Sequence, residues 1–144
     1  MKFENSVLIN RPVETVFDYV TDVRNNAHWQ SGVISIDPTS DQPAGLGSTF
    51  RCVNRFLGLR LETETIVTAY QHPLKCAFKI TSGMVSGESS FLFAAVNGAT
   101  KFTTVGELNL DYFKLANYLV ARRARLQLIR DMKTLKQILE KKQS

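Results

Sequence analysis

Histidine is the side chain whose ordinary pKa lies nearest neutrality, and the sequence contains two of them, His28 and His72. His28 immediately precedes the single tryptophan, Trp29, and His72 precedes Pro73 at a turn signal. A general base also needs a positioned partner and contact with substrate, and the neighbouring sequence supplies neither. We therefore keep His28 as a weak catalytic candidate and interpret both histidines as capping or surface residues.

The two cysteines, Cys52 and Cys76, form no metal motif, because the chain contains no CxxC or HxxxH spacing. In an antiparallel meander they would lie on strands separated by one other strand, roughly 9 to 10 Å apart, beyond the limit of about 7 Å for a disulfide. We predict two buried free thiols, no metal and no cofactor. Nucleophile-elbow, Walker and dinucleotide-binding sequences are also missing, and Gly45-Leu46-Gly47 is interpreted as a loop.

Paired carboxylates would be a stronger sign of acid–base catalysis, but strand alternation predicts that the glutamates of the middle segment lie on the outer face of a sheet. These glutamates are Glu62, Glu64, Glu88 and Glu107. The basic side chains available to them there are Arg51, Arg55, Arg60, Lys79 and Lys101. Exposed ion pairs contribute about 0 to 1 kcal/mol each, so we interpret these residues as a solvated surface.

The pattern of apolar residues and turn signals predicts the elements that position these groups. Alternation predicts a strand over 3–9, and Pro12 followed by apolar residues at helical spacing predicts a helix over roughly 12–20. A second short helix follows, from residue 21 or 22 to about 28. From about 32 to 110 six strands separated by turns fit the sequence, and the whole chain, 1–144, is predicted to be one domain.

Two predicted hairpin turns, Asn97-Gly98 and Leu57-Gly58, set the register of the sheet. Each turn places aromatic, small and hydroxyl-bearing residues on one face and mostly polar residues on the other. The facing pairs on the first of these faces are Phe93/Phe102, Phe91/Thr104, Phe50/Thr65 and Cys52/Thr63. An antiparallel sheet with one solvated face and one covered face follows from both turns.

Residues 111–141 contain no Gly or Pro, and their apolar residues recur at steps of three and four, which predicts a helix of about 30 residues and about 45 Å. The apolar stripe consists of Phe113, Ala116, Val120, Ala124, Leu128, Met132, Leu135 and Leu139. This helix would cover the inner face of the sheet. It also carries the net charge of +5, because residues 111–144 hold nine basic and three acidic groups, whereas residues 1–110 are nearly neutral.

The inner face of the sheet combines aromatic side chains with hydroxyl groups and meets the helix where its side chains are small. The candidate ligand-binding residues are Trp29, Phe50, Thr63, Thr65, Phe78, Phe91, Phe93, Phe102, Thr104, Ala116, Asn117 and Val120. In this interpretation the phenylalanines supply contact area, the threonines and Asn117 orient polar atoms, and Trp29 closes one end. The residues alone leave two interpretations open, a small-molecule cavity or a filled core whose threonine hydroxyls bond backbone carbonyls.

The order of strand, two short helices, six antiparallel strands and long C-terminal helix resembles the helix-grip fold of the START-like superfamily. The segments that carry the resemblance are VLINRPVETVFDYVTDVRNNAHW, GLGSTF, ETETIVTAYQHP, NGATKFTT and LKQILE. Within the superfamily the chain is most similar to the polyketide cyclase/dehydrase and lipid-transport group. The resemblance implies an α+β fold, in which a curved seven-stranded antiparallel sheet wraps around the long C-terminal helix with an apolar cavity between them.

The resemblance favours a cavity that binds or transports a small hydrophobic or amphipathic molecule, such as a lipid, quinone or polyketide-like compound, rather than an enzyme. One alternative is a cyclase or dehydratase that uses His28 or arginines at the cavity mouth. A second is a module that docks on RNA or membrane through Arg122, Arg123 and Arg125, although no aromatic residues interleave with this cluster for stacking on bases. Neither a signal peptide nor 18 consecutive apolar residues occur, so we expect a cytoplasmic protein.

Overall fold

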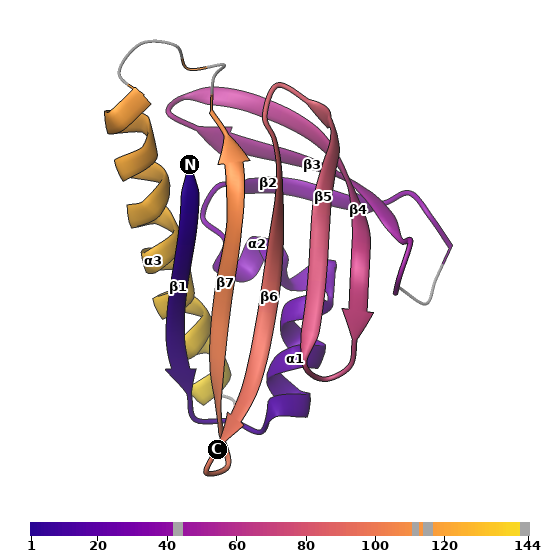
Figure 1. Cartoon of the computed structure of the whole chain (residues 1–144), viewed down its shortest axis with the longest axis vertical. Helices are drawn as coiled ribbons and strands as arrows, with labels where there is room; N and C mark the ends of the chain where they lie inside the picture. The colour runs from indigo at the N-terminus through magenta and orange to yellow at the C-terminus, as the bar shows by residue number, and fades with distance from the viewer. Residues whose placement is uncertain (42–44, 111–112, 114–116, 142–144) are drawn as a thin grey trace.

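The computed structural model describes residues 1–41, 45–110, 113 and 117–141. Its seven strands form one antiparallel sheet, as predicted, with short helices before β2 and a long helix after β7 (Figure 1). The strand order is β1-β7-β6-β5-β4-β3-β2. The elements are β1 (Lys2–Ile9), α1 (Val13–Thr21), the 3-10 turn η1 (Val23–Asn25), α2 (Asn26–Trp29), β2 (Val33–Pro38), β3 (Thr49–Phe56), β4 (Leu59–Gln71), β5 (Lys75–Gly83), β6 (Ser86–Val96), β7 (Ala99–Asn109) and α3 (Asn117–Lys141).

Both predicted hairpins form and have the predicted register. Asn97 and Gly98 have φ values of 50° and 83°, and Leu57 and Gly58 have values of 52° and 78°, so each two-residue turn uses the left-handed backbone region. The pairs Phe93/Phe102, Phe91/Thr104, Phe50/Thr65 and Cys52/Thr63 all face one another. The alternation of side chains therefore brings the aromatic residues of β6 and β7 and the threonines of β4 to the inner face.

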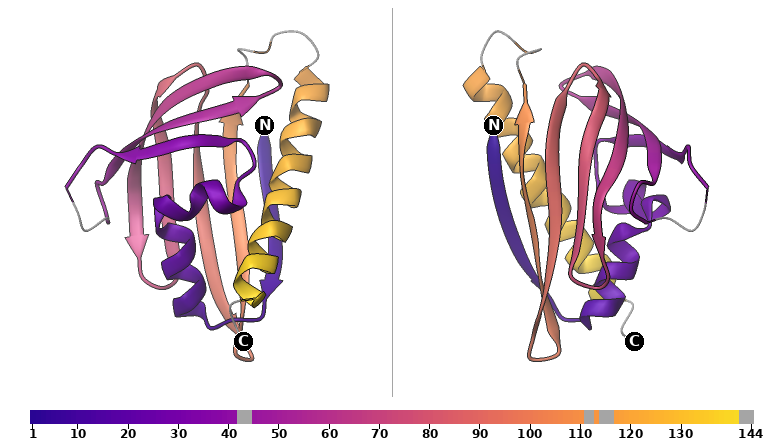
Figure 2. Two further views of the ribbon diagram at one scale, coloured as in Figure 1. Left: turned by 180° about the vertical axis from the view of Figure 1, so that it is seen from behind. Right: turned by 45° about the vertical axis from the view of Figure 1, so that its right-hand side comes forward.

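The three helices lie on one side of the sheet, with α3 running alongside the edge strand β1 (Figure 2). The buried apolar residues form two clusters. The main cluster includes the fully buried Ile9, Phe17, Phe102, Leu135 and Leu139. The second cluster, Leu61, Val85, Leu110 and Val120, lies where β7 ends and α3 begins.

The long helix begins later than the sequence predicted. Phe113 lies in a bend, where its N–H donates to the Leu110 carbonyl at 2.9 Å, and the described helix begins at Asn117. Residues 111–112 and 114–116 lie outside the described residues. From Val120 onward the predicted stripe is confirmed, because Val120, Met132, Leu135 and Leu139 are buried and Ala124 and Leu128 are half-buried.

Basic side chains of α3 close the free edge of β1. Arg125 donates to the Lys2 carbonyl at 3.1 Å, and Lys136 donates to the Leu8 carbonyl at 2.6 Å. Edge strands present unpaired carbonyls of this kind, which other chains can otherwise pair with. Two of the cations of α3 therefore have hydrogen-bond acceptors within the protein itself.

Candidate functional site

A cavity of about 180 Å³ lies between the two apolar clusters, on the inner face of the sheet. It is bounded by α2 and by side chains of β2 through β7. The residues that line it are Asn26, Gln30, Val33, Ile36, Phe50, Cys52, Asn54, Thr63, Thr65, Phe78, Ile80, Gly87, Glu88, Ser89, Phe91 and Leu108. Both apolar surface and several convergent polar groups are present, which is the usual composition of a small-molecule site.

Three phenylalanines form the apolar wall of the cavity. The ring centroids of Phe50 and Phe78 are 6.1 Å apart, and those of Phe78 and Phe91 are 5.0 Å apart, with each pair arranged edge to face. Edge-to-face contact is a favoured geometry for aromatic rings, so the three phenylalanines stabilise one another's positions. Phe50 belongs to the main cluster, and the ring centroid of Phe91 lies 5.4 Å from that of Phe102 in the same cluster.

Cys52 and two threonines form part of the polar wall. Burial raises the pKa of the Cys52 thiol, while side-chain hydrogen bonds with Thr65 and Thr63 act in the opposite direction. Thr63 and Thr65 therefore lie close to the Cys52 thiol on this wall. Because the net shift is upward, the thiol stays protonated near neutral pH and is a weak nucleophile.

Helix α2 contributes polar atoms that have no partner among the described residues. The side-chain oxygen Oδ1 of Asn26, a residue that lines the cavity, is fully buried and accepts no hydrogen bond. The indole Nε1–H of Trp29, a residue 4% exposed, also has no acceptor. A buried polar atom without a partner costs about 1 to 3 kcal/mol, which a ligand or a water at this position would offset.

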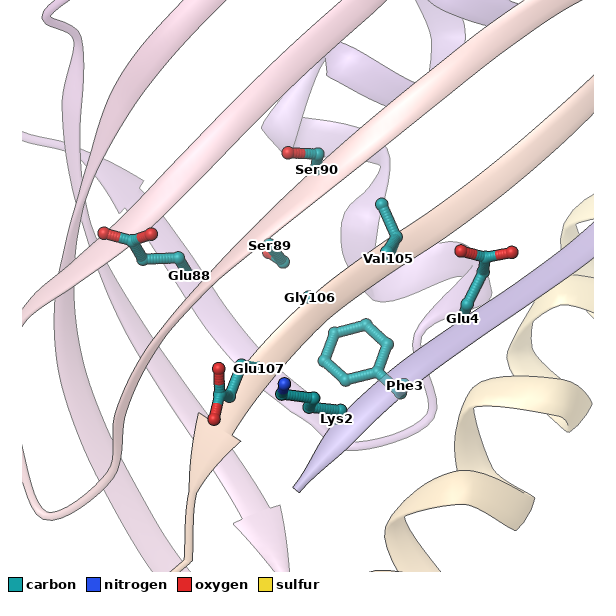
Figure 3. A pocket seen from close by; sticks show the side chains of 9 residues that line it. All are labelled: Lys2, Phe3, Glu4, Glu88, Ser89, Ser90, Val105, Gly106 and Glu107. Carbon is teal, nitrogen blue, oxygen red and sulfur yellow. The ribbon is translucent and has the colours of Figure 1, made fainter.

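A second hollow, of about 590 Å³, lies across β1, β7 and β6 and is open to solvent (Figure 3). Its floor is Gly106, and the ring of Phe3 lies beside it. The row of facing residues here is Lys79, Glu88, Glu107 and Lys2. Each of the two central glutamates has a lysine at the facing position of the next strand, so the charges of this row balance. We interpret this hollow as part of the outer surface of the sheet, where the sequence predicted these glutamates to lie.

A comparison with known families matches residues 1–140 to the family described as polyketide cyclase/dehydrase and lipid transport. The chain belongs to this family. No curated protein matches the chain. The match covers almost the whole sequence and confirms the resemblance on which the predicted fold was based.

Solved structures similar to this family member share its fold at low sequence identity. TTHA0849 from Thermus thermophilus has a TM-score of 0.85 and 16% identity, with both chains covered completely. A START superfamily protein from Mycobacterium smegmatis has a TM-score of 0.78 and 16% identity, with 97% of each chain covered. The di-domain ARO/CYC BexL from the BE-7585A biosynthetic pathway has a TM-score of 0.74 and 21% identity over 97% of this chain and 50% of that chain. These similarities establish a START-like fold.

The predicted site residues of this family member fall into three groups. Phe50, Thr63, Thr65, Phe78 and Phe91 line the cavity. Trp29, Phe93 and Phe102 belong to the main cluster behind it, and Thr104 is buried at the register position facing Phe91. Val120 lies in the second cluster and is not among the described lining residues, Ala116 lies outside the described residues, and Asn117 is the first residue of α3.

The histidines and the second cysteine lie away from the cavity lining. His28 is exposed at the end of α2. His72 Nε2 lies 2.9 Å from Asp18 Oδ1, and its ring packs edge to face on Phe17. Burial raises the pKa of the Cys76 thiol to about 12, as expected of a structural cysteine in the main cluster. Both cysteines are free.

No group of three or more His, Cys, Asp or Glu side chains in the described ranges is arranged to hold a metal ion. In the same ranges, no helix has the length and apolar character needed to cross a membrane.

Sequence reasoning missed three polar residues of the cavity: Asn26 of α2, Gln30 directly after α2 and Asn54 of β3. Asn54 could have been found, because it continues the alternation that places Cys52 on the inner face. Asn26 and Gln30 carry no such signal. Their orientation depends on how a one-turn helix docks against the sheet, which local sequence does not specify.

Asp131, a buried carboxylate of α3, holds the loop that leads from α2 to β2. It is 6% exposed, and its Oδ1 accepts a hydrogen bond from the Ser31 backbone N–H at 3.1 Å. Burial raises the pKa of this carboxyl above its ordinary value of 3.8, although hydrogen bonds from Ser31 and the charge of Arg130 partly offset the effect. The loop lies directly after the cavity residue Gln30, so α3 supports one wall of the cavity.

The raised pKa of Asp131 predicts the pH dependence of an Asp131→Asn variant. The folded protein binds this proton more tightly than the unfolded chain, so the stabilising contribution is complete below pH 3.8 and is lost as pH rises through the folded-state pKa. We expect the variant to be more stable than the natural protein at pH 8, with an advantage that shrinks as pH falls toward 4. Urea unfolding at several pH values measures this, and an advantage that grows on acidification would contradict it.

Proposed function

We propose that the chain binds one small amphipathic molecule in the cavity between α2 and the sheet, with an apolar body against Phe50, Phe78 and Phe91 and a hydrogen-bond donor directed at Asn26. The observation that carries the proposal is the buried oxygen of Asn26, which has no partner among the described residues and belongs to a residue that lines the cavity. The family description includes lipid transport, which agrees with a binding function.

The size of the cavity limits what the described residues can enclose. An apolar cavity of about 150 Å³ accommodates a benzene ring, so a cavity of about 180 Å³ suits a single substituted ring or a short branched chain. The polar groups restrict the choice further. An acceptor at Asn26 favours a hydroxyl or amide donor over a carboxylate, because a carboxylate would place two acceptors against each other.

The cyclase or dehydratase alternative requires a titratable side chain positioned in the cavity. Among the described lining residues, Cys52 and Glu88 are titratable. The raised pKa of the Cys52 thiol keeps it protonated, and Glu88 is exposed, opposite Lys79 and Glu107 on the outer face. This arrangement favours binding over acid–base catalysis.

Two serines on neighbouring positions of β6 provide a matched test of the proposed site. Ser89 lines the cavity, whereas Ser90 lies on the opposite face of the same strand. We expect a Ser89→Leu variant, which fills the cavity, to lose at least about tenfold in affinity for 4-methylphenol measured by NMR titration, and a Ser90→Leu variant to keep it. Equal affinity in both variants, or no saturable binding by the natural protein, would refute the proposal.

A further inference from the structure

The outward face of α3 carries exposed leucines among exposed cations. Leu119 and Leu126 are 58% and 49% exposed, although both are large apolar side chains. Positions three or four apart share one face of a helix, so these leucines form a continuous line with the exposed basic residues beside them. We call this line the α3 ridge, and its members are Leu119, Arg122, Arg123, Leu126, Arg130 and Lys133.

No ion pair with a described residue neutralises the cations of the α3 ridge, although the charge of Arg130 acts on the neighbouring Asp131. Arg122 and Arg123 make no hydrogen bond or ion pair with any described residue, in contrast to Arg125 on the flank of the helix, which bonds the Lys2 carbonyl. The two described acidic residues of α3 form their contacts with residues other than Arg122 and Arg123. Asp131 is buried against Ser31, and Glu140 pairs with Lys136 at 2.7 Å.

Leucines interleaved with arginines on an exposed helix face are typical of helices that lie in the interface of an anionic membrane. The aliphatic side chains enter the boundary between headgroups and acyl chains, and the guanidinium groups bond lipid phosphates. Tyr118, 76% exposed next to Leu119, is a residue type that favours this interface.

Other occupants fit the α3 ridge less well. A second copy of the chain related by a two-fold axis would bring ridge against ridge and arginine against arginine. A single-stranded RNA would need several aromatic side chains interleaved with the cations for stacking, and among the described residues of α3 only Tyr118 is aromatic. We therefore infer that the α3 ridge docks on bilayers that contain anionic phospholipids, a property separate from ligand binding in the cavity.

Vesicle co-sedimentation tests this inference. We expect binding to vesicles of phosphatidylcholine with 30 mol % phosphatidylglycerol, little binding to pure phosphatidylcholine, and loss of binding in 0.5 M salt. The double variant Arg122→Gln/Arg123→Gln should bind about 25-fold more weakly, since each basic residue near an anionic surface contributes about a fivefold factor. Leu119→Asn/Leu126→Asn should also weaken binding while leaving the charge unchanged.

Matched controls separate the ridge from net charge. Arg55→Gln/Lys101→Gln removes two exposed cations from strands and Leu92→Asn removes an exposed leucine from β6, and both should bind the vesicles as the natural protein does. Equal losses in ridge and control variants, or no vesicle binding at all, would overturn the inference. Tighter binding to a single-stranded RNA, or a dimer in solution that the arginine variant dissociates, would replace it with those partners.

Discussion

An Asn26→Leu variant should be more stable than the natural protein and should no longer prefer 4-methylphenol over toluene. Leucine has nearly the shape of asparagine and removes a buried acceptor that has no partner among the described residues, so the free energy of unfolding should rise by about 1 kcal/mol. The same change removes the proposed partner of the ligand hydroxyl. Affinity for 4-methylphenol should fall about tenfold, while affinity for toluene, which has no donor, should hold or rise.

Calorimetric titration with the two ligands and urea unfolding measure both effects. Asn54→Leu is the matched control. Asn54 also lines the cavity, but its amide oxygen is not one of the buried polar atoms without a hydrogen-bond partner. That variant should keep the preference for 4-methylphenol. If Asn26→Leu destabilises the fold and leaves the preference intact, Asn26 does not orient the ligand.

A Gly106→Ala variant should lose about 3 kcal/mol of stability, a large effect for a single methyl group. A methyl group at this position would overlap the carbonyl oxygen of Glu88 and lie 2.8 Å from the Ser89 Cα and 2.9 Å from Cζ of Phe3. Two of these three atoms are backbone atoms of the neighbouring strand, so β6 would have to move away from β7. The Phe3 ring occupies the space beside this glycine (Figure 3).

Gly45→Ala is the control for Gly106→Ala. No atom of a described residue other than its chain neighbours lies within 4 Å of a methyl group at Gly45, so this variant should be neutral or slightly more stable, because alanine restricts the unfolded chain. Thermal and urea unfolding compare the two. Equal stability of both variants would show that β6 and β7 adjust freely at Gly106.

The sequence predicted the sheet well because its turns are short. A two-residue hairpin at Asn97-Gly98 leaves only one register for β6 and β7, and alternation then places every side chain on a face. The start of α3 was less predictable, since apolar spacing continues through Phe113 although the chain turns there. Phe113 packs edge to face on Phe56 of β3, with ring centroids 5.6 Å apart.

The candidate site was predictable only where strands supply it. Phe50, Thr63 and Phe91 follow from alternation along β3, β4 and β6, and all three line the cavity. The polar residue that matters most for the proposed ligand, Asn26, comes from a one-turn helix whose docking depends on contacts distant in sequence. The role of Asp131 could not be predicted for the same reason, because the sequence around it does not indicate a hydrogen bond with the distant Ser31.

The contacts between α3 and β1 bear on how the protein avoids aggregation. A sheet that ends in a free strand invites an extended segment of another chain to add to it, and seven antiparallel strands leave two such ends. At β1 the cationic groups of Arg125 and Lys136 already occupy carbonyls that an incoming strand would need. At β2 the ladder is interrupted between Val33 and Ser35 and the strand ends at Pro38, which has no N–H to donate. Neither end therefore presents the long, regular template on which amyloid-like growth depends.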